Sequence, residues 1–300
     1  MFGDCHVHMV LDGVYYKDAI ADHRAGTRDD IIRPRLEDYA RRDIRYLRDG
    51  GDAFGAGERA RELAPDYGIE YRTPTFNICL KGRYGAFIGR TFETLRDFRA
   101  LVAEVKRRKG DFIKLMISGI MDFDVYGRIT SEPLTLKQMK ALFNIAHGEG
   151  FSVMAHANGA ETILNALEAG VDSVEHGAYM TDEAVRALAE CQVVWVPTLV
   201  TVGNLIGCGR YPDAVLTRIL DVQLQNVARC AALGGRIALG SDAGAYRVYH
   251  GQGTLDEYAL LKRALGDDTD RILTEGEAVI RQTFRYGAES RRQCPPDPIL

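Results

Sequence analysis

The chain has 300 residues, of which 46% are hydrophobic and 27% charged, and this balance is typical of a globular protein rather than a disordered or fibrous one. Its formal net charge of −4 argues against a nucleic-acid partner, which usually requires a basic surface. The first residues, MFGDCHVHMV, lack the basic and apolar regions of a secretion signal, and no apolar run is long enough to span a membrane. We therefore expect a cytoplasmic protein without a membrane partner.

Short apolar runs alternate with segments of helical period along the whole chain, which is typical of βαβ units around a parallel sheet. The runs predict about eight strands, with the second strand within 52–57 and the best-defined others at 2–10, 70–79, 112–118, 151–156, 171–176, 193–198 and 236–241. Amphipathic helices are predicted at 136–147 and 160–169. Since no linker or repeat divides the chain, residues 1–300 are predicted to form a single (β/α)8 barrel domain.

The first predicted strand carries Asp4, His6 and His8, which project to one face because strand side chains alternate. Two imidazoles on one face can share a metal ion. By itself the His-x-His string is weak evidence, because surface or capping histidines produce it more often than a metal site does, so the metal interpretation depends on the other strands.

Four further polar residues occupy later predicted strands or their ends. Lys114 interrupts the apolar run FIKLMIS, His156 and His176 each end an apolar run close to a glycine, and Asp242 follows RIALGS. Taken singly, each has a structural alternative: a lysine whose stem snorkels or forms a buried ion pair, a core or capping histidine, or a helix N-cap aspartate. Together they favour one site at the carboxyl ends of the strands, the active face of a barrel.

The pattern Asp4-x-His6-x-His8, Lys114, His156, His176 and Asp242 resembles the amidohydrolase superfamily. Within it, the strings FIKLM, AHANG, SVEHG and IALGSDAG resemble the imidazolonepropionase-like and Xaa-Pro dipeptidase-like branch. The resemblance implies a barrel, here without the flanking β-sandwich that is usual in relatives. Asn158 stands where several relatives carry a histidine, and we expect it to contact substrate.

The resemblance also implies a binuclear metal centre. His6, His8 and Asp242 would hold the more buried ion, His156 and His176 the more exposed one, and Lys114, carboxylated by CO2, would bridge both. Zinc is the default ion, although such ligands also admit Mn, Fe, Co or Ni. A hydroxide shared by the two ions would attack the substrate, with Asp242 acting first as general base and then as general acid.

Substrate contacts are expected from loops 81–90 and 119–133 and from the segment after Asp242. For each candidate an exposed loop residue is an equally good interpretation; Tyr246 and His250 rank first because they follow Asp242 most closely. The other candidates are Arg83, Tyr84, Tyr126, Arg128 and Arg247.

The function predicted from these observations is metal-dependent hydrolysis of an amide bond in a small substrate, such as a dipeptide, an N-acyl amino acid or a cyclic amide. The same ligands also support a deaminase or a lactonase. A non-catalytic metal-binding barrel is the alternative outside enzymes, and a homo-oligomer is compatible with all of these. The scattered cysteines lack CxxC spacing, which predicts free thiols and no structural zinc knuckle; they are Cys5, Cys79, Cys191, Cys208, Cys230 and Cys294.

Overall fold

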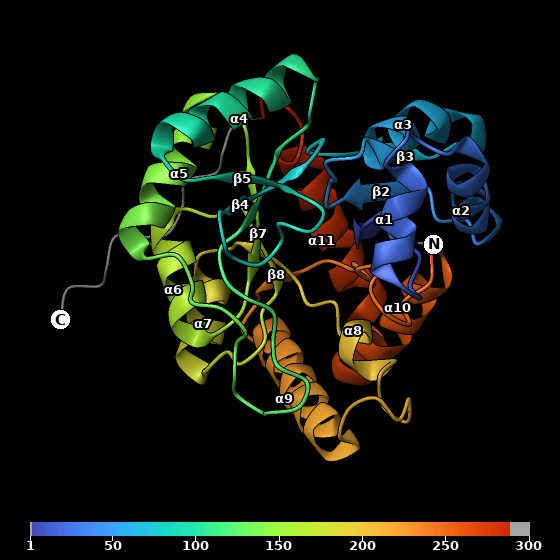
Figure 1. Cartoon of the computed structure of the whole chain (residues 1–300). Coiled ribbons are helices and arrows are strands. Elements are labelled where there is room, and N and C mark those ends of the chain that lie inside the picture. The colour runs from blue at the N-terminus through green and yellow to red at the C-terminus, as the bar shows by residue number, and fades with distance from the viewer. Residues whose placement is uncertain (1, 289–300) are drawn as a thin grey trace.

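The computed structural model describes residues 2–288 as a mixed α/β fold with two parallel sheets. Figure 1 shows the strands gathered in the middle, with the helices around them. The smaller sheet has the order β1 (Asp4–Val7), β2 (Tyr46–Asp49) and β3 (Glu70–Arg72). The larger sheet has the order β10 (Arg236–Ile237), β9 (Val194–Val196), β8 (Ser173–His176), β7 (Val153–Ala157), β6 (Ile113–Met116), β4 (Asn77–Leu80) and β5 (Arg90–Phe92).

Helices follow most strands and cover the sheets, as expected for βαβ units. The predicted helices at 136–147 and 160–169 are confirmed as α5 (Leu136–Gly148) and α6 (Ala160–Ala169). The other helices are α1 (Tyr16–His23), α2 (Asp29–Arg41), α3 (Ala56–Leu63), α4 (Leu95–Arg107), α7 (Asp182–Glu190), α8 (Val200–Gly203), α9 (Asp213–Ala232), α10 (Gln252–Leu265) and α11 (Thr269–Thr283), with 3-10 turns η1 (Ala64–Tyr67) and η2 (Gly266–Asp268).

Local chemistry fixes where several helices begin. Thr94 caps α4 by accepting a hydrogen bond from the backbone N–H of Asp97, whose carboxylate accepts one from the Thr94 N–H in return. Thr135 and Gln138 make the same reciprocal pair at the start of α5. Such capping boxes satisfy N–H groups that have no partner within the helix, so these starts are encoded locally.

Two strand predictions need correction. The second strand is β2 (Tyr46–Asp49) rather than a run within 52–57, where α3 already begins at Ala56. The apolar run 70–79 forms two strands, β3 and β4, because Pro74 and the left-handed backbone of Thr75 (φ 68°) break it. The remaining predicted runs each contain or overlap a strand of the structure.

The first strand lies beside the segment that follows β10. The backbone N–H of Cys5 donates to the carbonyl of Leu239 over 2.8 Å, and that of Asp242 donates to the carbonyl of His6 over 2.7 Å. Near the other edge of the small sheet, Asp111 N–H donates to the carbonyl of Thr73 over 2.9 Å. The carboxyl ends of β1, β6, β7 and β8 and the segment after β10 consequently meet.

Four cysteines are free thiols as predicted, namely Cys5, Cys79, Cys208 and Cys230. Cys191 is disulfide-bonded, so the prediction of a free thiol is wrong for this residue. Cys294 lies outside the described residues. Among residues 2–288, no helix combines the length and the apolar character needed to cross a membrane.

Candidate metal centre

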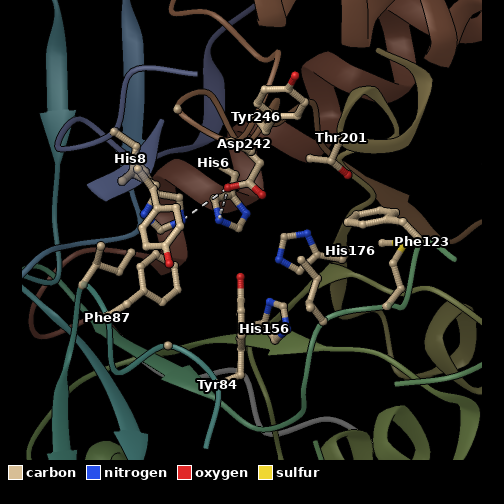
Figure 2. A pocket seen from close by; sticks show the side chains of 18 of the residues that line it. His6, His8, Tyr84, Phe87, Phe123, His156, His176, Thr201, Asp242 and Tyr246 are labelled. Carbon is tan, nitrogen blue, oxygen red and sulfur yellow. Dashed lines mark ion pairs between the residues drawn. The ribbon is translucent and has the colours of Figure 1, made fainter. Parts of the chain in front are cut away.

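Two histidines of the first strand and one acid from the far end of the chain converge on a single point. The Nε2 atoms of His6 and His8 lie 3.5 and 3.3 Å from Oδ1 of Asp242. Their possible ligand atoms all lie within 4.8 Å of one another, a spacing that a single ion can bridge. Figure 2 shows the three side chains turned toward one another at the floor of a pocket.

The other two predicted histidines complete a continuous group of four imidazoles. The ring centre of His176 lies 5.1 Å from that of His6 and 4.5 Å from that of His156. The parallel register pairs His156 with Glu175 and Ala157 with His176, so the two histidines lie one residue apart in register on neighbouring strands. Both rings face the interior in Figure 2.

Lys114 lies beside His6 and is fully buried. Its Nζ is 3.4 Å from Nε2 of His6, and within residues 2–288 no carboxylate lies within ion-pair distance of it. Burial lowers its pKa to about 8 against the opposing charges of Glu175 and Asp242. A buried lysine without an ion-pair partner is unfavourable for stability, which indicates that the position serves a function.

Three of the four imidazoles have one ring nitrogen held by the protein. Nδ1 of His6 lies 2.9 Å from Oε2 of Glu175, Nδ1 of His176 lies 2.7 Å from Oγ1 of Thr198, and Nε2 of His156 lies 3.1 Å from the carbonyl of Gly119. Metal-binding histidines typically have their second nitrogen held in this way, which orients the ring and selects the tautomer. The residues therefore fit a metal centre.

The protonation states favoured by the site also suit metal binding. Burial lowers the pKa of His8 and of His156 to about 3, and it lowers the pKa of His6 and of His176 well below the usual range. The imidazoles are thus neutral near pH 7, the form that ligates cations. Burial raises the pKa of Asp242 to about 7, while the charge of Lys114 opposes that rise.

Two site residues have an unusual backbone. His176 and Asp242 adopt left-handed conformations, with φ of 67° and 59°. Non-glycine residues in this region are uncommon and concentrate at functional sites. The indole N–H of Trp195 donates to the carbonyl of His176 over 3.0 Å, which holds the strained turn in place.

A buried ion pair between Arg48 and Glu175 supports His6, and no sequence motif indicated it directly. Both oxygens of Glu175 accept hydrogen bonds from Arg48, at 2.8 and 2.9 Å, while Nε of Arg48 donates to the carbonyl of Cys5. Neither side chain is exposed. The only available signal was a charged residue within a run of strand period, as in YLRD and SVEH.

A cavity of about 450 Å³ opens above the cluster. Asn158 and Tyr246, two of the predicted substrate contacts, line it, as does Tyr84. In Figure 2 the hydroxyl of Tyr84 points toward the middle of the cavity. The Asn158 side chain is already engaged, because its Oδ1 accepts from the Ala178 N–H and its Nδ2 donates to the carbonyl of Gly119.

The remaining candidate loop residues do not line this cavity. His250 is buried against the carbonyl of Leu11 and the hydroxyl of Tyr39, at 2.8 and 3.1 Å, and acts as a packing residue. Arg83 pairs with Glu132, and Arg128 with Asp122. Tyr126 stacks under Arg218, and Arg247 is exposed.

Comparison with curated proteins finds distant relatives. The chain is 30% identical over 189 residues to an uncharacterised protein of Mycobacterium tuberculosis, covering 60% of this chain and 49% of the relative. It is 24% identical over 275 residues to ochratoxinase of Aspergillus niger, covering 80% of this chain and 56% of the relative. The chain thus spans about half the length of the curated relatives that it matches. No family model matches it.

Solved structures give a closer match in three dimensions. A Xaa-Pro dipeptidase with bound methionine superimposes with a TM-score of 0.74 at 19% identity, covering 96% of this chain and 77% of that one. Ochratoxinase of A. niger gives 0.72 at 19% identity, with 93% and 71% covered. Bottromycin amidohydrolase gives 0.67 at 17% identity, with 96% and 69% covered. The chain shares the fold of these solved structures.

The resemblance to Xaa-Pro dipeptidase-like amidohydrolases, drawn from the sequence strings, is therefore confirmed at the level of the fold. An amidohydrolase fold alone does not define an activity, because one fold hosts many functions. Any activity depends on the histidine cluster and the cavity above it.

Proposed function

We propose that this protein is a metal-dependent amidohydrolase that cleaves a C–N bond in a small substrate. The observation that carries the proposal is the convergence of four imidazoles, Asp242 and a buried, unpaired Lys114 on the floor of one cavity. The match to ochratoxinase over 80% of this chain supports the same reaction class.

A single closed (β/α)8 barrel over residues 1–300 is part of the proposal. The chain runs from β3 into β4 without a helix between them, which supports an arrangement of the two sheets as neighbours in one layer. The hydrogen bonds from Cys5 to Leu239 and from Asp242 to His6 supply the contact that would close the layer. The carboxyl-end position of the cluster then matches the active face of a barrel.

The donor set divides into two groups. His6, His8 and Asp242 would hold one ion, and His156 and His176 a second. Imidazole and carboxylate ligands suit zinc, which is the ion that we propose.

We propose that Lys114 carries a carboxyl group derived from CO2. Burial favours the neutral amine, and an amine lone pair attacks CO2 to form a carbamate, releasing one proton. The carbamate would convert a buried cation next to neutral imidazoles into an anion with two oxygen ligands. This change removes the electrostatic conflict between Lys114 and two bound cations.

The reaction adds one water across the amide: a C–O bond forms, the C–N bond breaks, and the leaving nitrogen gains a proton. When bound, the metal ions supply Lewis acidity, lowering the pKa of a water and polarising the amide carbonyl. Asp242 accepts the proton of the attacking water and passes it to the nitrogen, a role that suits a carboxylate lying within 3.5 Å of two histidine nitrogens and lining the cavity. The Tyr84 hydroxyl can donate a hydrogen bond to the amide oxygen.

The proposal is tested by measuring metal content and amide hydrolysis in the same preparations. We expect one to two equivalents of zinc per purified chain and turnover of N-acyl amino acids or dipeptides that chelators abolish. His156→Ala should lower both quantities. His23→Asn is the matched control, because His23 lies outside the cluster and asparagine can still accept the hydrogen bond from the Arg28 N–H. A chain that purifies metal-free and stays inactive with added zinc contradicts the proposal.

A further inference from the structure

One part of the cavity rim is aromatic and open to solvent. Tyr15, Tyr16 and Phe87, here called the aromatic arc, all line the cavity and expose 47%, 45% and 39% of their surface. The rings of Tyr16 and Phe87 meet edge to face at 5.3 Å, and those of Tyr15 and Tyr16 lie 6.0 Å apart. An exposed apolar surface of this kind beside a reactive centre is a binding surface for an apolar group.

Another part of the rim carries a cation. Arg210 lines the same cavity, and its guanidinium carbon lies 4.8 Å from the ring centre of Tyr246 and 5.3 Å from that of Tyr211. Stacking on two rings holds the guanidinium plane while leaving its N–H groups free. Within residues 2–288, no carboxylate lies within ion-pair distance of Arg210.

The charges of the cavity are asymmetric. Among the described residues that line it, Asp242 is the sole Asp or Glu, and Arg210 is the cationic side chain at the rim, because Lys114 is buried beside His6 and is proposed to carry a carboxyl group. Asp242 is committed to the metal cluster, so a substrate ammonium group would find no other carboxylate among the described residues that line the cavity. A substrate carboxylate would find Arg210, whose planar fork matches its two oxygens.

Resting on the proposed function, we infer that the substrates are N-acyl amino acids with a bulky apolar acyl group, rather than dipeptides with a free amino terminus. The acyl group packs on the aromatic arc and the carboxylate of the amino acid binds Arg210. Hydrolysis at the amide between them releases a carboxylic acid and a free amino acid. Arg210 is therefore a specificity-determining residue.

Three substrates separate the contribution of the carboxylate from the effect of an ammonium group. N-benzoyl-L-alanine carries both features, N-benzoyl-L-alaninamide lacks the anion, and L-phenylalanyl-L-alanine adds an ammonium group. For the zinc-loaded protein, we expect kcat/KM for N-benzoyl-L-alanine to exceed that for either of the others by about tenfold or more, as for one lost charge-assisted contact. Preference for the dipeptide would overturn the inference.

The variant Arg210→Gln tests the residue. We expect kcat/KM for N-benzoyl-L-alanine to fall about tenfold, mainly through KM, with little change for N-benzoyl-L-alaninamide. Arg247→Gln is the matched control, since Arg247 is exposed nearby but does not line the cavity. Equal losses on the acid and the amide, or equal losses in both variants, would overturn the assignment.

Binding measurements separate failure of this inference from failure of the proposed function. Calorimetry on the Asp242→Asn protein should show about tenfold tighter binding of N-benzoyl-L-alanine than of its amide, and Arg210→Gln in that background should abolish the difference. Equal binding of acid and amide overturns the inference whether or not the native protein turns over. Selective binding without turnover in the native protein contradicts only the proposed function.

Discussion

At the scale of single residues, Asp242 combines two properties: it lies beside the possible metal ligands His6 and His8, and its pKa is raised. It lies within 3.5 Å of two histidine nitrogens, and it has a raised pKa of about 7. We expect Asp242→Asn to retain bound zinc, because four histidines and Lys114 remain, and to lose at least about 10²-fold in kcat, because an amide cannot carry the proton. Zinc content by mass spectrometry and turnover check this. Loss of zinc in the variant would make Asp242 chiefly a ligand.

Tyr84 supplies a second test at this scale. Its ring centre lies 4.9 Å from that of His156, and its hydroxyl faces the cavity. Tyr84→Phe keeps the ring and removes the donor, so we expect kcat to fall by roughly 10- to 100-fold with KM and zinc content little changed. A change confined to KM would instead assign Tyr84 to ground-state binding.

Glu257 predicts a pH dependence of stability away from the cluster. Oε2 accepts a hydrogen bond from the Val200 N–H at 2.7 Å, Oε1 is buried without a partner, and burial raises the pKa to about 8. The folded state holds this proton while the unfolded chain releases it near pH 4.5. The resulting stability is present below about pH 4.5 and is lost as pH rises toward 8.

Glu257→Gln mimics the protonated acid at every pH. The free energy of unfolding of the variant minus that of the native chain should therefore grow between pH 5 and 8, by at most about 1.4 kcal/mol per pH unit. Urea denaturation at several pH values measures it. The exposed Glu190→Gln serves as control, and a difference independent of pH would show that Glu257 is ionised in the fold.

At the scale of elements, the backbone at the end of β8 is closely packed against Trp195. Gly177 has φ of 69°, and a methyl group there would lie 2.6 Å from Nε1 of Trp195, the atom that holds the His176 carbonyl. We expect Gly177→Ala to destabilise the fold by about 2 kcal/mol or more and to weaken zinc binding by displacing His176.

Gly234→Ala provides the comparison for that prediction. Gly234 has φ of 75° with nothing within 4 Å of an added methyl group, so this variant isolates the backbone cost, about 1 kcal/mol. Thermal denaturation and zinc titration of both variants give the difference. Equal effects on both would show that contact with Trp195 is unimportant.

The elements also show what sequence reasoning can reach. The apolar runs of most strands could be recognised in the sequence. The polar residues at their carboxyl ends could be recognised too, because a polar or charged side chain is costly to bury and is therefore unusual within an apolar run. The strand β2 was missed since Arg48 and Asp49 are buried inside the fold, where Glu175 and Thr73 satisfy them. These partners lie far away in the sequence, so periodicity could not reveal them.

The same limit applies to the substrate contacts. His250 follows Asp242 closely in sequence but turns inward to Tyr39, while Arg210, in the segment between α8 and α9, reaches the cavity. Proximity along the chain therefore identified Tyr246 as a lining residue but misplaced His250 and missed Arg210. The residues of the cluster could be predicted from the sequence, because each lies on or next to a strand. The pairing of the strands then fixes the position of each residue along the sheet.

For the whole molecule, metal binding should couple to stability. The ligands come from both ends of the described chain, so an ion that binds only the folded state must stabilise all of it. At a zinc concentration 100 times Kd, we expect about 2.7 kcal/mol of additional stability and a rise in Tm of several degrees. The shift should vanish with a chelator and in His6→Asn, and persist in His23→Asn. A Tm that is insensitive to zinc would contradict the proposed centre.

The junction between β1 and the segment after β10 has a consequence for biosynthesis. Asp4 accepts hydrogen bonds from the hydroxyls of Ser241 and Thr254, and Asp242 N–H binds the carbonyl of His6. On the ribosome, β1 is translated long before Ser241, Asp242 and Thr254 and must wait for them. His6 and His8 are thus kept from forming the finished metal centre until these later residues have left the exit tunnel.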